Sequence, residues 1–441
     1  MNSQHTRTLL VSSGNQVVWL GGLRMSSLVL LLVGLVFSTQ AWAVCAPQTE
    51  EQYEAMRREM VEVAVKGAGV TNERVLAAML ATPRHEFVPK KIRRTQSYLD
   101  AGVPIGKSQT ISSPFIVAYM TQELMPQPTD VVLEIGTGSG YQAAILSPLV
   151  KEVYSIEIVE KLGKSAAKVL KKLKYENVFT KIGDGYKGWV EHAPFDKIIV
   201  TCSPEDIPTP LVEQLKEGGT IIVPMGERHQ QTLYLMEKKD GKMVRKALRP
   251  TLFVPMTGTA EDQRKVLPDP LNPTLTNGDY EQGLDENGFA RGWYYQRQMT
   301  LERSDDAPSG KSFVQFKNSV PGQLSQLMQG FAIDGRKVST VKLSLSFACE
   351  NVVVGPRPND LPVAAISFFD KERKELGMHL LGPHRGTKDW LSQSRSIRVP
   401  HSAREGIVRI GLFGATGTAK FDNLKVQAVR NLKNESPNST Y

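Results

Sequence analysis

The spacing of apolar positions changes about midway along this chain. From Glu50 to about Ala260, short apolar runs alternate with stretches in which apolar residues recur every three or four positions. The runs predict strands and the stretches predict helices. Repetition of strand, helix and strand is typical of a parallel sheet with helices on both faces. The expected strands are 131–135, 152–156, 177–182, 197–201 and 220–223, and the expected helices are 51–66, 72–81, 142–147, 159–174 and 209–215.

Cap and turn residues mark the ends of some of these elements. Thr71 is the expected N-cap of the second helix, and Pro83 ends that helix. Strands at 233–237 and 251–255 are expected to close the sheet as a pair, with Asp240-Gly241 as a turn between segments.

The composition changes after Asp262. Prolines and polar turn residues across 262–287 indicate a linker that leads into a new domain. Beyond it, apolar and polar residues alternate, as in 341–347 and 408–412, which predicts antiparallel strands with one face in water. The predicted organisation is a doubly wound, mostly parallel α/β domain at 50–260, a linker at 261–274, an antiparallel β-sandwich (jelly-roll) domain at 275–430 and a polar tail at 431–441.

The N-terminus has the pattern of a targeting segment. An apolar run at 28–37 follows Arg7 and Arg24, and Ala41-Trp42-Ala43 offers small residues at a cleavage site. This pattern predicts a secretory signal peptide over 1–43, and hence a periplasmic or secreted protein. The alternative is an uncleaved membrane anchor, although the run is shorter than the roughly 20 residues that a spanning helix needs.

Composition and charge exclude several classes of protein. Hydrophobic residues make up 41% of the chain and charged residues 22%, so a disordered, collagen-like or multi-span membrane protein is not expected. The net charge of +9 is spread along the chain, which does not favour a nucleic-acid partner. Three cysteines without metal-binding spacing indicate neither a disulfide framework nor a zinc site.

A glycine-rich turn follows the first expected strand of the sheet. Gly136, Gly138 and Gly140 let the backbone turn tightly and let a ligand approach it closely. Glu157 lies about 20 residues further on, at the end of the next strand, where ribose hydroxyls are held in nucleotide-binding folds. Gly183-Asp184-Gly185 ends the third strand, and its carboxylate can accept a hydrogen bond from an adenine amino group.

The glycine spacing separates the candidate cofactors. The spacing G-x-G-x-G differs from the G-x-G-x-x-G of dinucleotide sites, and no Gly-Lys-Ser/Thr follows it. Together with Glu134 directly before the turn, this favours S-adenosylmethionine over NAD. The predicted cofactor-binding residues are Glu134, Gly136, Gly138, Gly140, Glu157, Asp184 and Gly185.

Residues 104–114, Pro-Ile-Gly-Lys-Ser-Gln-Thr-Ile-Ser-Ser-Pro, resemble the P-I-G-x-G-Q-T-I-S-Q-P signature of protein-L-isoaspartate O-methyltransferases, which are class I methyltransferases. Further matches are Pro83-Arg84, Phe87-Val88, Gly183-Asp184-Gly185, Ala193-Pro194-Phe195-Asp196, Ile207-Pro208 and Phe253-Val254-Pro255. The resemblance covers about 53–260, roughly half of the chain. Ser108 and Ser113 depart from the signature, which has glycine and glutamine there.

This resemblance implies an activity and a site. It implies methyl transfer from S-adenosylmethionine to the free α-carboxylate of L-isoaspartyl, and also D-aspartyl, residues in damaged proteins, in the cytoplasm. Ser112 carries over as the active-site serine that orients the acceptor carboxylate, with Thr110 and Ile111 in the same cleft. Thr201 follows the fourth strand, where substrate loops lie. The competing interpretation is that Ser112 merely caps the helix that begins near Pro114.

The second domain resembles galactose-binding-like β-sandwich modules. The similar segments are 275–283, 292–294, 410–414 and 421–424. The resemblance implies a glycan ligand and, in some members, a structural calcium, for which Glu281 and Asp422 are the first residues to test. Trp293 and Trp390 are candidates for stacking on sugar rings, although core aromatics are more frequent.

Three functions are therefore open: an exported, monomeric isoaspartyl methyltransferase; a class I methyltransferase for another carboxylate or hydroxyl; or an inactive glycan-binding surface protein.

Overall fold

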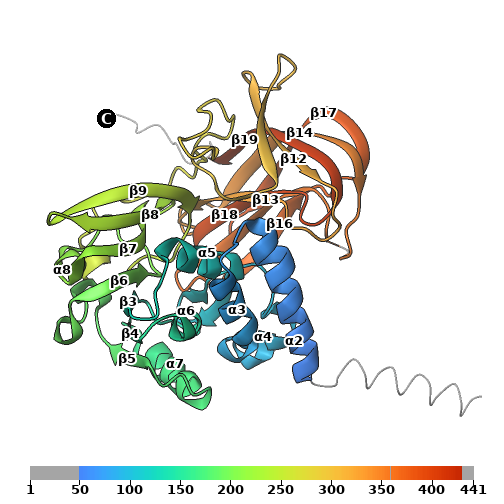
Figure 1. Ribbon diagram of the computed structural model, residues 1–441. Coiled ribbons are helices and arrows are strands. Elements are labelled where there is room, and N and C mark those ends of the chain that lie inside the picture. Colours follow the sequence, from blue (N-terminus) through green and yellow to red (C-terminus); the bar gives the residue numbers. More distant parts are fainter. Residues whose placement is uncertain (1–48, 358, 430–441) are drawn as a thin grey trace, which may run out of the picture. The chain divides into compact units, whose positions relative to one another are not determined.

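The alternating pattern of the first half folds into a seven-stranded sheet with the strand order β5-β4-β3-β6-β7-β8-β9 (Figure 1). The computed structural model describes residues 49–357 and 359–429. Strands β3 to β7 are parallel, whereas β8 and β9 continue the sheet as antiparallel neighbours. The strands are β1 (Val103–Gly106), β2 (Gln109–Ile111), β3 (Val131–Ile135), β4 (Glu152–Glu157), β5 (Val178–Ile182), β6 (Phe195–Val200), β7 (Leu215–Glu227), β8 (Gln230–Lys239) and β9 (Lys242–Thr251).

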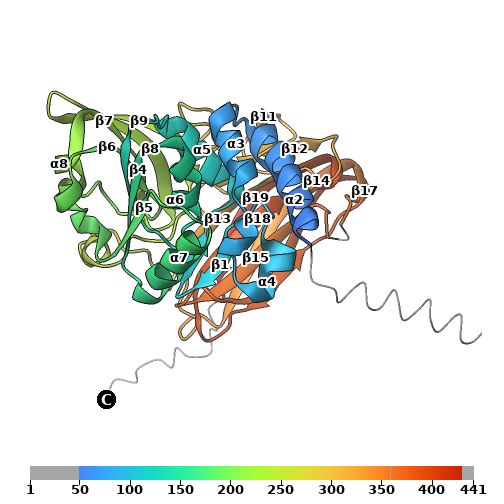
Figure 2. The same cartoon turned by 60° about the horizontal axis from the view of Figure 1, so that its bottom comes forward.

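Helices cover both faces of this sheet because alternate strand residues are apolar on both sides. Val132, Val153 and Ile199 lie in one apolar core, whereas Leu133 and Ile156 lie in another. Helices α5 and α6 pack on β7, β6 and β4 (Figure 2). The helices are α2 (Glu50–Glu59), α3 (Glu73–Ala81), α4 (Lys90–Gln96), α5 (Pro114–Leu124), α6 (Tyr141–Leu146), α7 (Glu160–Lys172), α8 (Thr209–Glu213) and α9 (Thr259–Asp262).

Local details differ from the expectations at three places. The expected helix 51–66 is α-helical only to Glu59 and continues as a π-helix, Met60–Val65. Asn72 caps α3 in place of Thr71, because its side chain accepts hydrogen bonds from the amides of Arg74 and Val75, the second and third helical residues. The expected strand 251–255 is wrong. Strand β9 instead begins directly after the Asp240-Gly241 turn and ends at Thr251.

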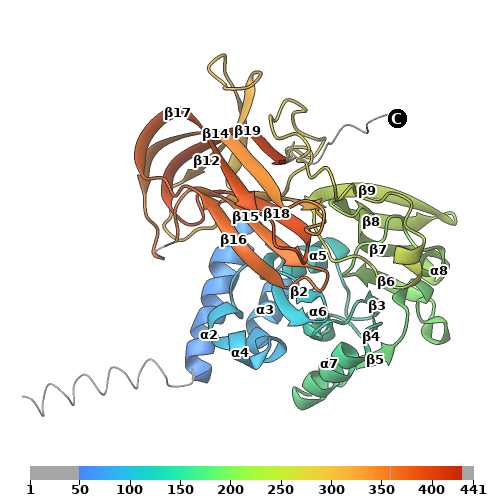
Figure 3. The same ribbon diagram turned by 180° about the vertical axis from the view of Figure 1, so that it is seen from behind.

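The second half contains two five-stranded antiparallel sheets, β10-β13-β18-β15-β16 and β11-β12-β19-β14-β17 (Figure 3). Phe347 and Phe421 of one sheet share an apolar core with Ile366 and Val408 of the other. The sheets therefore pack as a sandwich. The strands are β10 (Tyr294–Arg297), β11 (Met299–Arg303), β12 (Ser312–Asn318), β13 (Gln326–Ala332), β14 (Thr340–Val353), β15 (Val363–Asp370), β16 (Glu375–Leu381), β17 (Gly386–Arg398), β18 (Ala403–Gly411) and β19 (Thr416–Ala428).

The α/β half and the sandwich belong to one compact unit that begins at Glu50. The predicted targeting segment, 1–43, and the predicted tail, 431–441, lie outside the described residues. Among the helices that the structure does describe, none has the length and apolar character needed to cross a membrane.

Candidate active site

The loops that follow β3 and β6 meet at the topological switch point of the sheet, where successive connections run toward opposite edges. Strand β3 lies between β4 and β6, so the loops after β3 and β6 flank one crevice at the carboxyl ends of the strands. Ligands of open α/β sheets bind at such a switch point. The cleft found there is lined by Thr110, Ile111, Ser112, Ile116, Val117, Met120, Gly136, Thr137, Gly138, Ser139, Tyr141, Gln142, Thr201 and Phe253.

Gly136 lets the loop after β3 pass close to the loop after β6. Its φ is 96°, and a Cβ built on it would lie 2.5 Å from Thr201 Oγ1. The Thr201 hydroxyl is within hydrogen-bond distance of two carbonyls, those of Ile135 at 3.0 Å and Gly136 at 2.7 Å. Thr201 therefore closes the bottom of the cleft, and only glycine leaves room for it at position 136.

The other two glycines of the turn have different roles. The Gly138 amide lines the cleft and donates to Glu157 Oε2 at 2.7 Å. Gly140 is the N-cap of α6 with φ of 90°, and its Cβ position faces Leu170 at 3.2 Å. Gly140 is not among the lining residues, so its glycine is explained by close packing against α7.

The Glu157 carboxylate is fixed by backbone amides on both of its oxygens. Oε1 accepts from the Val159 amide at 2.8 Å, and Oε2 accepts from Gly138. Burial raises the pKa of Glu157, while these amides oppose the shift. Each carboxylate oxygen can accept more than one hydrogen bond, so a ribose diol could still be held here.

Glu134 lies beneath the turn and not among the residues that line the cleft. Its side chain is fully buried and accepts a hydrogen bond from Ser155 Oγ. Burial, followed by the charge of Glu157, raises the pKa of Glu134 to about 8 against the Ser155 hydrogen bond. The expectation that Glu134 contacts the cofactor is thus replaced by a supporting position under the glycine turn.

This buried carboxyl gives the folded chain a pH-dependent stability. Because the pKa of Glu134 is about 8 when folded and 4.5 ordinarily, the folded chain binds a proton that the unfolded chain releases between those values. The stabilisation from protonated Glu134 is therefore fully present at a pH below the pKa of the unfolded chain. It is lost as the pH rises through the pKa of the folded chain. In Glu134→Gln, the drop in the free energy of unfolding from about pH 5 to about pH 8 should be smaller by about 2–4 kcal/mol. Urea unfolding across that range measures it, and an unchanged drop contradicts the assignment.

Asp184 and Gly185 shape the loop after β5. Asp184 Oδ1 accepts from the Tyr186 amide, and Oδ2 accepts from the hydroxyl and the amide of Thr259 at 2.6 and 3.1 Å. Burial raises the pKa of Asp184, but these hydrogen bonds outweigh it and leave the pKa lowered. A Cβ on Gly185 would meet Ile135 Cγ2 at 2.4 Å, so this glycine is required by packing. Neither residue lines the cleft.

Ser112 lines the cleft and is not the cap of α5. The cap is Ser113, whose Oγ accepts from the Ile116 amide at 3.4 Å. Within the described part of the chain, the Ser112 hydroxyl has no hydrogen-bond partner. The alternative in which Ser112 serves only as a helix cap is therefore wrong, and its hydroxyl is available to a ligand.

Arg84 is a buried residue whose contribution to the site the sequence did not reveal. Its guanidinium donates to the carbonyls of Ser112 at 2.8 Å and Ser97 at 2.9 Å, and it lies 4.7 Å from the centre of the Tyr141 ring. These contacts fix the backbone that carries Ser112. Arg84 belongs to the Pro83-Arg84 match, which was the one signal that could have identified it.

Several other lining residues come from helix faces that look like ordinary core in the sequence. Ile116, Val117 and Met120 belong to α5, and Phe253 follows β9. Cys202, next to the site, has its pKa raised by burial and by Glu157 and Asp184, so its thiol is held protonated.

The acidic candidates of the sandwich bind backbone amides. Glu281 Oε1 accepts from the amides of Lys311 and Ser312, and Asp422 Oδ2 accepts from the Ser309 amide at 2.8 Å. No group of three or more His, Cys, Asp or Glu side chains suited to a metal occurs among the described residues. The two carboxylates thus organise the loop before β12.

The two candidate tryptophans occupy different environments. Trp293 is fully buried and donates to the Asn277 carbonyl at 2.9 Å, so it is a core residue and cannot stack on a sugar. Trp390 is half-buried and packs edge-on against Phe313.

The residue types around the crevice suit the nucleoside part of S-adenosylmethionine. Gly136 and Gly138 line the cleft. Glu157 is not among the lining residues, but it accepts from the Gly138 amide and keeps acceptor capacity for a diol. Ser139 and Gln142 add polar groups on the same wall. These features suit a nucleoside, which joins a polar sugar to a flat base. The turn lacks the Gly-Lys-Ser/Thr sequence with which a Walker loop binds phosphates.

Comparison with known proteins identifies relatives of the α/β half. A family model described as protein-L-isoaspartate(D-aspartate) O-methyltransferase (PCMT) matches residues 55–261. A protein-L-isoaspartate O-methyltransferase of Opitutus terrae is 50% identical over 235 residues, which are 53% of this chain and 97% of the relative. Another, of Dictyoglomus turgidum, is 48% identical over 47% of this chain and 93% of the relative. A solved β-aspartate methyltransferase (PCMT) of Plasmodium falciparum, in complex with S-adenosyl-L-homocysteine, is 25% identical over 46% of this chain and 98% of its own, with a TM-score of 0.41.

The sandwich lies beyond the residues that the family model matches. The Opitutus terrae relative is 50% identical over the aligned residues, which cover 97% of the relative. The signature, the glycine turn and the strands of the seven-stranded sheet all fall within the residues that the family model matches. On these grounds the chain belongs to the protein-L-isoaspartate(D-aspartate) O-methyltransferase family.

Proposed function

We propose that this protein transfers a methyl group from S-adenosylmethionine to the free α-carboxylate of L-isoaspartyl residues, and also of D-aspartyl residues, in damaged proteins. The products are a methyl ester and S-adenosylhomocysteine. The ester then closes to a succinimide with loss of methanol, and hydrolysis of the succinimide returns some normal aspartyl linkage. Support comes from family membership and from one observation: the Ser112 hydroxyl and the glycine turn line the same cleft.

The bound cofactor would supply an electrophilic methyl group, so the chain itself needs no strong base. A carboxylate is already ionised at neutral pH. The task of the site is to align the acceptor oxygen and to exclude water without leaving the charge unpaired. Ser112 is proposed to donate to the acceptor carboxylate, with Thr110 and Ile111 beside it and Thr201 holding the floor of the cleft.

The first turn of α5 is not free to bind the acceptor carboxylate. Asp100 Oδ1 accepts from the Phe115 amide at 3.1 Å, and Ser113 accepts from the amides of Ile116 and Val117. Among the polar residues that line the cleft, we therefore propose the Ser112 hydroxyl, on the loop before the helix, as the donor to the acceptor carboxylate.

Purified protein should methylate an isoaspartyl peptide and leave the matching aspartyl peptide unmodified. The expectation follows from the cleft, because a carboxylate displaced by one methylene cannot meet the same donor and the same methyl group. Transfer of labelled methyl groups to both peptides measures it. Equal methylation of the two peptides, or of neither, contradicts the proposed substrate, and a screen of small carboxylate and hydroxyl acceptors then tests the broader methyltransferase assignment.

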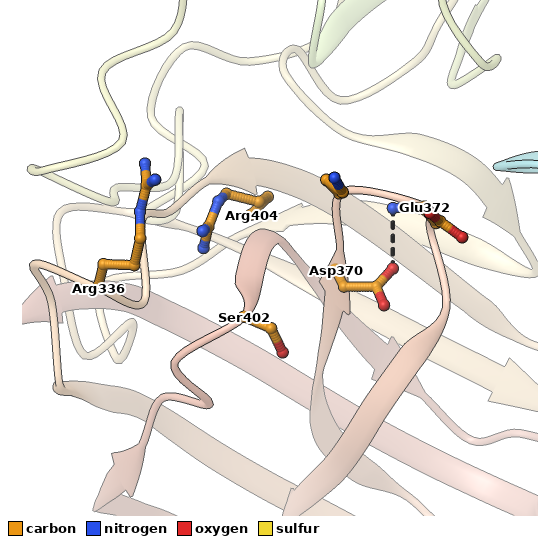
Figure 4. Close-up of a pocket in the computed structure, with 6 residues that line it drawn as sticks. Arg336, Asp370, Glu372, Ser402 and Arg404 are labelled. Carbon is orange, nitrogen blue, oxygen red and sulfur yellow. Dashed lines mark hydrogen bonds between the residues drawn. The ribbon is translucent and has the colours of Figure 1, made fainter.

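A glycan ligand for the sandwich remains a hypothesis. A hollow on this half is lined by Arg336, Asp370, Lys371, Glu372, Ser402 and Arg404. Figure 4 shows Arg336 and Arg404 on one side of it and Asp370 and Glu372 on the other. Both arginines already pair with Asp334, at 2.7 and 3.3 Å. The hollow has no aromatic wall for a sugar ring, so a glycan array is the direct test.

Cellular location and assembly are proposed on the sequence alone. We keep the proposal of an export signal over 1–43, an α/β domain at 50–260 and a monomeric chain. N-terminal sequencing of the protein from fractionated cells tests the first, and light scattering tests the last.

A further inference from the structure

The sandwich contributes a charged side chain to the active-site helix. Arg297 at the end of β10 pairs with Asp100 at 2.7 Å, and the two side chains are only 10% and 6% exposed. The guanidinium also lies 4.0 Å from the centre of the Phe115 ring on α5. Asp100 lies within the residues that match the family model, whereas Arg297 lies outside them.

Asp100 is placed where its charge matters to the site. Its Oδ1 caps the Phe115 amide, and Phe115 comes three residues after Ser112. A carboxylate at a helix N-terminus is stabilised by the helix dipole. However, an unpaired anion beside the acceptor site would repel the carboxylate of the substrate, and a buried charge is costly when its partner is removed.

The backbone of β10 is distorted in a way that directs Arg297 out of the sandwich. Tyr295 and Gln298, on either side of it, have φ of 53°, and the pairing of β10 with β13 shifts register between Tyr294 and Arg297. Such strain in residues other than glycine is retained where the surrounding structure holds it. Tyr295 also reaches the α/β half, where its hydroxyl donates to the Leu252 carbonyl at 3.4 Å.

A second arginine, Arg249, lies near enough to Asp100 for that charge to raise its pKa, but it forms no ion pair with Asp100 among the described residues. The Arg249 guanidinium lies over three aromatic rings, those of Phe115 at 4.7 Å, Tyr119 at 5.2 Å and Phe289 at 5.2 Å from the ring centres. Burial, and then the charge of Arg297, lowers the pKa of Arg249 to about 10. The ion pair to Asp100 is made by Arg297 alone among the described residues.

We propose that Arg297 is a positioning residue for methyl transfer, which holds the start of α5 through Asp100 and neutralises that carboxylate beside the acceptor site. The sandwich is therefore a working part of the methyltransferase site and not only an attached binding module. This inference rests on the proposed function, since the anion that must be admitted is the isoaspartyl carboxylate.

The test uses three variants of the full chain: Arg297→Met, the double variant Asp100→Asn/Arg297→Met and, as matched control, Arg303→Met. Arg303 ends β11, the next strand along the chain, which belongs to the other sheet of the sandwich. We expect Arg297→Met to raise KM for the isoaspartyl peptide about tenfold or more, with S-adenosylhomocysteine affinity unchanged by calorimetry. The double variant should recover most of this loss, because asparagine can still cap Phe115 without a charge. A purely structural role would not give this recovery. Arg303→Met should match the wild type.

Each outcome decides a different point. A KM unchanged in Arg297→Met, or no recovery in the double variant, overturns the positioning role. A wild-type chain that methylates no isoaspartyl peptide overturns the proposed function instead. In that event hydrogen exchange of the segment 113–118 still decides whether Arg297 holds α5: faster exchange in Arg297→Met than in Arg303→Met supports the contact, and equal exchange refutes it.

Discussion

Replacing Ser112 with alanine is expected to lower kcat/KM for an isoaspartyl peptide by about 10- to 100-fold. A hydrogen bond to a charged group contributes about 1.5–3 kcal/mol, and each 1.4 kcal/mol corresponds to about a tenfold change in rate. The loss is expected in the transfer step because Ser112 lines the cleft and its side chain does not cap α5. Steady-state kinetics with both substrates varied measures it.

Ser113→Ala is the matched control for this prediction. Ser113 caps α5 one residue further along, so its loss should reduce the free energy of unfolding by about 1 kcal/mol and change kcat/KM little. The affinity for S-adenosylhomocysteine should be the same in both variants. If Ser112→Ala keeps full activity, or if the two alanines behave alike, Ser112 does not orient the acceptor.

Replacing Gly136 with alanine is expected to weaken S-adenosylhomocysteine binding by about 100-fold, since a displacement near 1 Å at a site can have that effect. The new methyl group would meet Thr201 Oγ1 at 2.5 Å, and the φ of 96° strains any residue with a Cβ. Relief of the clash must move the turn or break the Thr201 hydrogen bonds that close the floor of the cleft. Titration calorimetry of the purified variant measures the affinity.

Gly183→Ala provides the comparison within the same set of loops. A Cβ on Gly183 meets nothing within 4 Å, and its backbone does not have the positive φ seen at Gly136. Its affinity should stay within about twofold of the wild type, since surface substitutions away from special features are usually near neutral. Comparable losses in the two variants would mean that the clash with Thr201 is not the cause.

Many strands and helices of the α/β half could be predicted from the local pattern of apolar residues. The strand at 131–135 and the glycine turn after it were placed correctly, because alternating burial on both faces of a parallel sheet leaves a plain periodic trace. The competing interpretation of Ser112 as the cap of α5 was wrong, and the pattern could not exclude it because Ser112 and its neighbour Ser113 are chemically identical. The strand expected at 251–255 was wrong because the real strand, β9, is exposed along much of its length and therefore carries little apolar signal.

The sequence by itself determined the fold class, the cofactor turn and the serine that faces the cleft, because each depends on residues close together in the chain. It also led to the family through a signature within eleven consecutive positions. Only the tertiary structure decided that neither Glu134 nor Glu157 lines the cleft, and that Glu157 holds the amide of the lining residue Gly138 whereas Glu134 holds Ser155. The pairing of Asp100 with Arg297 joins residues almost two hundred positions apart. No periodicity encodes such a contact, because it arises from the packing of one folded half against the other.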